Sequence, residues 1–210
     1  MHRSAILKLQ RQFMSQNQMM NRATNTKPPC DVFINHRGID TKRTVGTLLY
    51  DQLYRLNLTP FLDNKNMKPG DKLFENINRA IRQCKVGVAV LSPRYCESYF
   101  CLHELALIME TKKKVIPIFC DIKPSHLRIN IDKAQCSPED IRRFNWALEE
   151  TKYTVGLTFD SLKGNWSEVV TSATDIVIKS LIEIENEKYM LRRKIQIPPV
   201  HCIKHGNMLP

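Results

Sequence analysis

Two separate stretches of the sequence carry side chains suited to binding or acting on a ligand. The first, NHRGIDTKR at residues 35–43, contains Gly38, which lets backbone approach a ligand closely. Its three cations, which can hold phosphates at the start of a helix, are Arg37, Lys42 and Arg43. In a simpler interpretation, Asp40 or Thr41 caps a helix and the cations are only solvated.

The second stretch, SPRYCESYFCLHE at residues 92–104, ends on an acid, Glu104. At 100° per residue, a helix over 101–112 places Glu104 between Cys101 and Ile108, on the stripe that faces a sheet. Carboxylates are seldom buried without a purpose or a partner. Glu104 is therefore either a functional acid or a carboxylate that stabilises the helix dipole, and spacing alone names no reaction.

Alternating strand and helix patterns must position both stretches. Apolar runs predict strands at residues 31–35, 59–63, 86–92, 115–122 and, weakly, 156–160. Amphipathic spacing predicts helices at residues 44–56, 72–84, 101–112, 138–150 and 165–184, with Ser137 as an N-cap. This alternation favours an α/β protein with a parallel sheet between two helical layers.

For five units of this size we predict a flavodoxin-like three-layer fold with strand order 2-1-3-4-5. Ligands bind such sheets outside the carboxyl ends of strands 1 and 3, where residues 35–43 and 92–104 meet. That meeting favours ligand contact over mere capping. The segment DNKNMKPGD (residues 63–71) overhangs the same edge and is either a lid or an ordinary surface turn. The predicted lid residues are Asn64, Met67, Pro69 and Gly70.

The net charge of +11 is concentrated near the two ends of the chain. Residues 1–29 carry five basic side chains and residues 189–210 carry four, with no acid in either stretch. The remaining part has 23 basic and 21 acidic residues, so a domain-wide nucleic-acid surface is not expected. We predict a folded domain over 29–186 between a basic N-terminal segment (1–28) and a basic C-terminal tail (187–210), both disordered.

The number and spacing of the cysteines bear on the cellular compartment of the protein and on metal binding. Seven scattered cysteines, no CxxC pair and no secretory signal favour a reducing compartment, the cytoplasm, with the nucleus as a further option. The acid-free N-terminal segment also has the composition of an organelle transit peptide. No apolar run approaches the ~20 residues of a membrane span. His201, Cys202 and His205 lack a second ligand pair, so no metal site is predicted.

Several ordered motifs resemble a plant Toll/interleukin-1 receptor (TIR) domain over residues 29–184. They are CDVFINHRGIDTKRT, TPFLDN, KPGD, VAVLSPRYCESYFCLHEL and VIPIFCDIKPS. The form NHRGIDTKRT, and the absence of a nucleotide-binding or leucine-rich portion, resemble the TIR-only proteins of flowering plants. The resemblance implies an NAD+ nucleosidase acting in immune or cell-death signalling. Such an enzyme releases nicotinamide with ADP-ribose or a cyclic isomer, such as 2′-cyclic ADP-ribose.

By this resemblance Glu104 is the catalytic acid, and NAD+ is the substrate, with no cofactor. The positions implied to contact NAD+ are Asn35, His36, Arg37, Gly38, Ile39, Asp40, Lys42, Ser98 and Phe100. Lys42 replaces the family's usual arginine, and Phe100 replaces its usual tryptophan, for which we expect altered affinity because the smaller ring still stacks. Cys101 is a candidate auxiliary residue.

The resemblance also implies partners. TIR sites of this type are completed by the lid of a neighbouring copy, so a homo-oligomer and contacts with other TIR proteins are expected. Two alternatives remain: a non-catalytic TIR–TIR interaction module, and a nucleic-acid-dependent cyclic nucleotide synthase that uses Cys101 and the basic tails. A phospho-receiver is disfavoured because Ser92 and Asn35 stand where that site needs acids.

Overall fold

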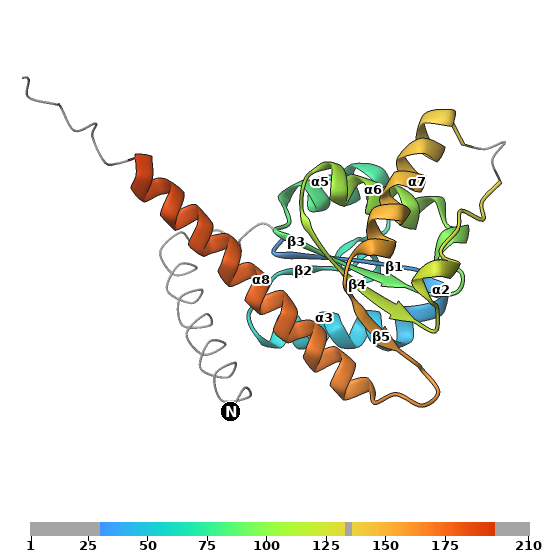
Figure 1. Cartoon of the computed structure of the whole chain (residues 1–210), viewed down its shortest axis with the longest axis horizontal. Coiled ribbons are helices and arrows are strands. Elements are labelled where there is room, and N and C mark those ends of the chain that lie inside the picture. The colour runs from blue at the N-terminus through green and yellow to red at the C-terminus, as the bar shows by residue number, and fades with distance from the viewer. Residues whose placement is uncertain (1–29, 133–135, 196–210) are drawn as a thin grey trace, which may run out of the picture.

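A computed structural model describes residues 30–132 and 136–195 of the chain. Five parallel strands form one sheet in the order β2-β1-β3-β4-β5, as predicted (Figure 1). The strands are β1 (Val32–His36), β2 (Pro60–Phe61), β3 (Val86–Leu91), β4 (Lys114–Cys120) and β5 (Leu157–Phe159). β1 and β3 are buried along their whole length, because helices cover both faces of the sheet.

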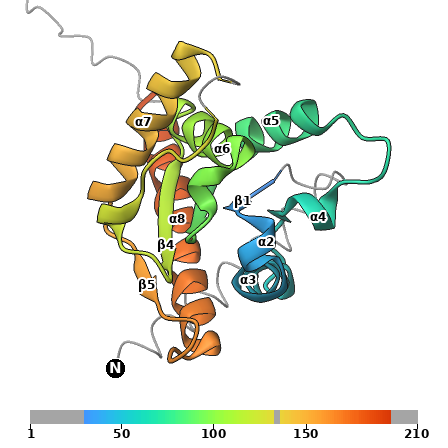
Figure 2. The same cartoon turned by 90° about the vertical axis from the view of Figure 1, so that its right-hand side faces the viewer.

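The helices form two layers, one on each face of the sheet (Figures 1 and 2). One layer holds α3 (Thr47–Arg55) and α8 (Trp166–Ile195). The other holds α5 (Leu73–Gln83), α6 (Tyr99–Glu110) and α7 (Pro138–Tyr153). Alternation along β1 divides the core, since Val32 and Ile34 pack with the first layer and Phe33 with the second.

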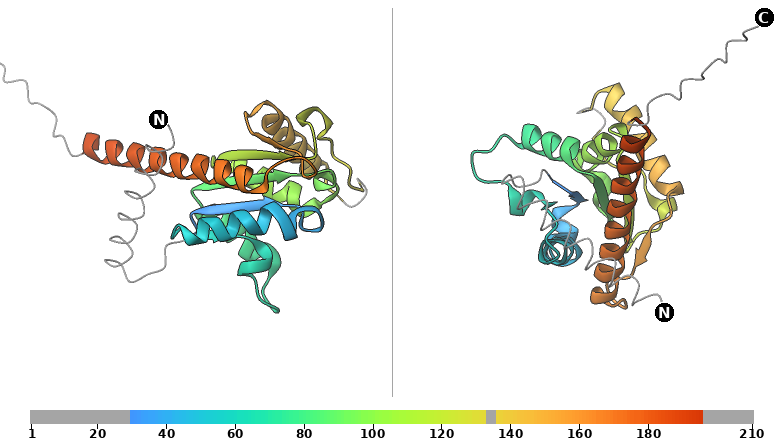
Figure 3. Two further views of the ribbon diagram at one scale, coloured as in Figure 1. Left: turned by 90° about the horizontal axis from the view of Figure 1, so that it is seen from below. Right: turned by 90° about the vertical axis from the view of Figure 1, so that its left-hand side faces the viewer.

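Helix α7 begins as the sequence predicts. The Ser137 side chain accepts a hydrogen bond from the backbone N–H of Asp140, and Pro138 occupies the first turn, where its missing N–H costs nothing. The predicted end of the last helix at residue 184 is wrong, because α8 continues to Ile195 beyond the sheet (Figure 3). The apolar periodicity stops at residue 184, but the residues that follow have high helix propensity. Glu185 also forms an ion pair with Lys85.

Short helical pieces replace two predicted loops. After β1 the chain forms α2 (Gly38–Thr41) and a π-helical turn (Lys42–Gly46) before α3 begins, three residues later than predicted. After β2 it forms α4 (Asp63–Asn66), inside the predicted lid. Gly70 follows with φ of 95°, a conformation that favours glycine.

Several predictions fall outside the described residues: the disordered 1–28 segment, the tail after 195 and the His201–Cys202–His205 cluster. Over the ranges 30–132 and 136–195, the structure holds no helix long and apolar enough to cross a membrane.

Candidate active site

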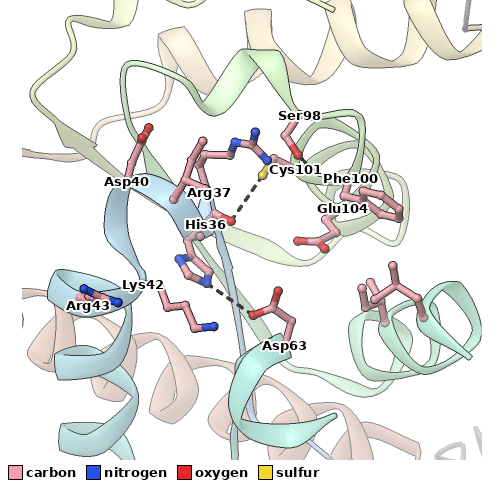
Figure 4. Close-up of a pocket in the computed structure, with 14 residues that line it drawn as sticks. His36, Arg37, Asp40, Lys42, Arg43, Asp63, Ser98, Phe100, Cys101 and Glu104 are labelled. Atoms are coloured by element: carbon pink, nitrogen blue, oxygen red, sulfur yellow. Dashed lines mark hydrogen bonds and ion pairs between the residues drawn. The ribbon is translucent and has the colours of Figure 1, made fainter. Parts of the chain in front are cut away.

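The carboxyl ends of β1 and β3 border a cavity of about 750 Å³, a volume typical of small-molecule sites (Figure 4). Most residues implied by the resemblance line it. They are His36, Arg37, Gly38, Ile39, Asp40, Lys42, Ser98, Phe100, Cys101 and Glu104. Arg43, which the sequence offers as a phosphate-binding cation, lines it too. Asp63, Leu73 and Ile77 also line it and were not predicted as site residues.

Glu104 projects into the cavity from the second turn of α6 and is only 8% exposed. Burial raises the pKa of its carboxyl group from 4.5 to about 8, against a lowering hydrogen bond from Asn35, and the charge of Asp63 raises it further. This acid is therefore largely protonated at neutral pH. A cationic ligand beside it would favour the ionised form.

Asn35 lies beneath Glu104 and donates a hydrogen bond to it, and Asn35 does not line the cavity. Its amide Nδ2 donates to Oε2 of Glu104 at 2.7 Å and lies 3.2 Å from the carbonyl oxygen of Cys101. The Tyr95 hydroxyl donates to Oδ1 of Asn35, which fixes the orientation of the amide. Asn35 is fully buried and positions Glu104, while its predicted contact with substrate stays a prediction. Side chains alternate along a strand, so residues 33 and 35 both face α6. This alternation is the sequence signal that indicates the position of Asn35.

Removing the Asn35 amide should make Glu104 harder to ionise. In Asn35→Ala the carboxylate loses a hydrogen bond that favours its charged form, so its pKa should rise above 8. Asp63→Asn should lower this pKa, because a nearby negative charge disappears. Carboxyl ¹³C NMR titration measures both shifts. A Glu104 that titrates near 4.5 in all three proteins would contradict this electrostatic description.

Asp40 lines the cavity, but its carboxylate is committed elsewhere. It accepts hydrogen bonds from the Ser92 hydroxyl at 2.7 Å and from the Arg94 side chain at 2.8 Å. Burial opposes ionisation of Asp40, but these bonds outweigh it and hold its pKa below the usual value. Asp40 thus ties α2 to the loop after β3, and its predicted contact with substrate stays a prediction.

Three cations face the cavity from the segment after β1: Arg37, Lys42 and Arg43 (Figure 4). The side chains of Lys42 and Arg43 are exposed. The buried Nε of Arg37 meets no hydrogen-bond acceptor within the described ranges. A buried donor without a partner is costly unless a ligand satisfies it. The segment therefore offers positive charge and one unused donor to an anionic group.

One aromatic ring, that of Phe100, lines the cavity beside Glu104, and other rings pack behind it. Phe100 is 37% exposed, and its ring centroid lies 5.0 Å from that of Phe74, tilted by 34°. Tyr99 and His103 extend this cluster. Exposed aromatic faces stack favourably on flat heterocycles. Phe74 was not predicted, because a helix residue exposed on the side away from the sheet has no periodic signal.

Cys101 and Ser98 hold the start of α6 in place. The Ser98 hydroxyl caps the helix by accepting from the backbone N–H of Cys101 at 3.3 Å. The Cys101 thiol lies 3.3 Å from the carbonyl oxygen of His36 and donates to it. Burial, with the charge of Glu104, raises the pKa of this thiol to about 12, so it is not a thiolate at neutral pH. Cys101 thus joins α6 to β1.

Three of the four predicted lid residues, Met67, Pro69 and Gly70, do not line the cavity. Met67 packs against the cluster around Phe33 and Ile77, while Pro69 and Gly70 are exposed. The side chain of Asn64 is not among those that the structure describes. Asp63 is the residue of this segment that lines the cavity, with a half-exposed side chain. The short helix α4 causes the difference, because it turns the later residues outward.

The order of strands and the cavity at the switch point, with its buried acid beside three cations, define an α/β protein of the flavodoxin-like class with a candidate ligand site. The chain belongs to the TIR domain family, whose model matches residues 30–180.

The chain is similar in sequence or structure to several known proteins, over different lengths. It is 51% identical to the Brachypodium distachyon protein named Probable 2' cyclic ADP-D-ribose synthase BdTIR, across 74% of this chain and 70% of that one. It is 35% identical to TMV resistance protein N of Nicotiana glutinosa, across 52% of this chain but 10% of that protein. The TIR domains of the activated Roq1 resistosome superimpose with a TM-score of 0.61 at 26% identity, covering 70% of this chain and 99% of that one.

Proposed function

We propose that this TIR protein cleaves the nicotinamide–ribose bond of NAD+. The observation that carries the proposal is the Glu104 carboxyl group, buried in the switch-point cavity and fixed by Asn35. The 51% identity to a Brachypodium protein named as a cyclic ADP-ribose synthase supports the same chemistry.

The buried acid suits the charge that this reaction develops. Nicotinamide leaves as a neutral molecule and takes the bonding electron pair, so the ribose becomes oxocarbenium-like. A fixed carboxylate stabilises that charge strongly where water is scarce. NAD+ itself brings a positive pyridinium ring, which favours ionisation of an acid whose pKa is about 8. Binding of NAD+ therefore favours the charged form of Glu104.

The rest of the cavity matches the other parts of the dinucleotide. Arg37, Lys42 and Arg43 supply positive charge for the pyrophosphate, and the unused Nε of Arg37 supplies a donor. The face of Phe100 suits a nicotinamide or adenine ring. NAD+ is the substrate in this scheme, and the neutral leaving group requires no cofactor.

Two products are open to the cleaved intermediate. Water at C1′ gives ADP-ribose, and a hydroxyl of the adenine-side ribose gives a cyclic isomer, which we take to be 2′-cyclic ADP-ribose as in the name of the Brachypodium relative. Exclusion of water favours the cyclic product. We place the reaction in the cytoplasm, since all six described cysteines are free thiols.

Nicotinamide release tests the proposal directly. The purified protein is incubated with NAD+, and nicotinamide is followed by chromatography, with heat-denatured protein as the control. We expect release from the native protein alone. If no nicotinamide is released at any enzyme concentration, the non-catalytic TIR–TIR interaction module becomes the better description of this domain.

Activity should rise more than proportionally with enzyme concentration. Ile39, which lines the cavity, is 59% exposed, so a neighbouring copy has room to complete the site. The related Roq1 TIR domains were solved within a resistosome assembly. Specific activity measured from nanomolar to micromolar protein should therefore increase. A specific activity that stays constant over this range would show that one copy suffices.

A further inference from the structure

His36 occupies a closely fitted place at the end of β1 and is 7% exposed. Its Nδ1 lies 2.9 Å from the hydroxyl oxygen of Thr41. On the same side, a side-chain carbon on Gly46 would lie only 3.1 Å from Nδ1, so glycine leaves the room that the ring needs. The ring is therefore held in one orientation, with Nε2 toward the cavity and Asp63 (Figure 4).

The hydrogen bonds around Thr41 determine which ring nitrogen carries the proton. The Thr41 hydroxyl donates its single proton to the carbonyl oxygen of Arg37 at 3.1 Å. In this arrangement its oxygen accepts from His36, which matches the neutral imidazole with its proton on Nδ1. Nε2 is left as a bare acceptor, and among the described residues it has no hydrogen-bond partner although it is buried.

Asp63 lies close to this nitrogen. Its Oδ1 lies 3.5 Å from Nε2, too far for a good hydrogen bond but close enough for an ion pair. Two acceptors at this separation repel each other until a proton arrives. Once Nε2 is protonated, the imidazolium and the carboxylate attract. Glu104 lines the same cavity, so a proton acceptor and the charge-stabilising acid border one bound ligand.

We propose that Nε2 of His36 accepts the proton of the ribose hydroxyl that closes the cyclic product. This inference rests on the proposed function. The C1′–N bond breaks and its electron pair leaves with nicotinamide, the hydroxyl oxygen bonds to C1′, and the hydroxyl proton moves to Nε2 and then to solvent. NAD+ thus yields nicotinamide, cyclic ADP-ribose and one proton. An attacking water can release its proton to bulk water, so His36 favours the cyclic product over ADP-ribose.

The ratio of cyclic ADP-ribose to ADP-ribose tests the inference, because this ratio does not depend on how much enzyme is folded. In His36→Phe an aromatic ring fills the same place without an acceptor, and we expect the ratio to fall about tenfold or more. Thr41→Val removes the acceptor that fixes Nδ1–H and should lower the ratio by a smaller factor.

Thr174→Val is the matched control for Thr41→Val. Both threonines are 1% exposed, and both donate to the carbonyl oxygen four residues earlier, but Thr174 lies in α8, which does not border the cavity. We expect its product ratio to equal that of the wild type.

An unchanged ratio in His36→Phe overturns the inference, and so does an equal fall in Thr41→Val and Thr174→Val. A wild-type protein that releases nicotinamide without any cyclic product overturns it too, while leaving the proposed function intact. A protein that releases no nicotinamide removes the proposed function itself.

Discussion

The Glu104→Gln protein should release nicotinamide from NAD+ at least about a hundredfold more slowly than the wild type, because removing one preorganised stabilising group typically costs this much. Glutamine preserves the volume of the side chain and an oxygen that can accept from Asn35, so the pocket keeps its shape. What the variant lacks is the negative charge beside the cationic ribose. The effect should appear mainly in kcat, since the charge acts most strongly on the transition state.

Glu97→Gln provides the control for this experiment. Glu97 lies in the short 3-10 turn before α6 and is exposed, and it does not line the cavity. Its substitution changes net charge by the same amount close to the same helix. Initial rates of nicotinamide release are compared at saturating and at low NAD+. Equal rates for Glu104→Gln and the wild type would remove Glu104 from the chemistry.

The same Glu104→Gln substitution should stabilise the fold at alkaline pH. The carboxyl group has a pKa of about 8 in the folded protein against an ordinary value of 4.5. Below pH 4.5 it is protonated in both states and costs nothing. As pH rises from 4.5 to 8, the folded protein keeps a proton that the unfolded chain has lost, so stability falls. Above pH 8 the full penalty applies, on the order of a few kcal/mol.

Chemical denaturation at pH 5 and pH 9 measures this difference. Glutamine carries no charge at either pH, so the gain in unfolding free energy over the wild type should be near zero at pH 5 and largest at pH 9. Glu97→Gln should show no such dependence, since that side chain is exposed. A gain of equal size at both values would mean that glutamine stabilises by packing, and burial of a charge would not be its cause.

Together these two experiments describe a trade between stability and activity at one residue. Glu104 is held where its charge is unfavourable, because the same low-polarity surroundings make that charge effective on a cationic substrate. Asn35 and Tyr95 limit the cost by fixing the carboxylate through one hydrogen-bonded chain.

Much of this site was predictable from local patterns. Helical spacing placed Glu104 on the buried stripe of α6, and the strand order followed from the alternation of apolar and amphipathic segments. The end of α8 was not predictable in this way, because the helix continues past its last apolar contact on helix propensity and charge pairs.

The role of individual polar residues depended on contacts between segments distant in the chain. Asp40 and Arg94 are 54 residues apart, and only the folded loops show that the carboxylate is consumed by this pair. Asn35 and Glu104 are 69 residues apart, and whether the amide meets a substrate or the acid depends on which side of β1 it occupies. Local patterns contain no such distances, so the sequence predicts both residues only as ligand contacts.

The sequence by itself determined the sheet, its switch point and the two segments that meet there, because periodicity and strand alternation are local properties of the chain. The tertiary structure alone decided which side chains face the cavity and which support it from behind. Asp63 enters the site, while Met67 packs into the core. The physical reason is that burial and hydrogen-bond partners, which set each side chain's protonation and direction, exist only once distant segments are packed together.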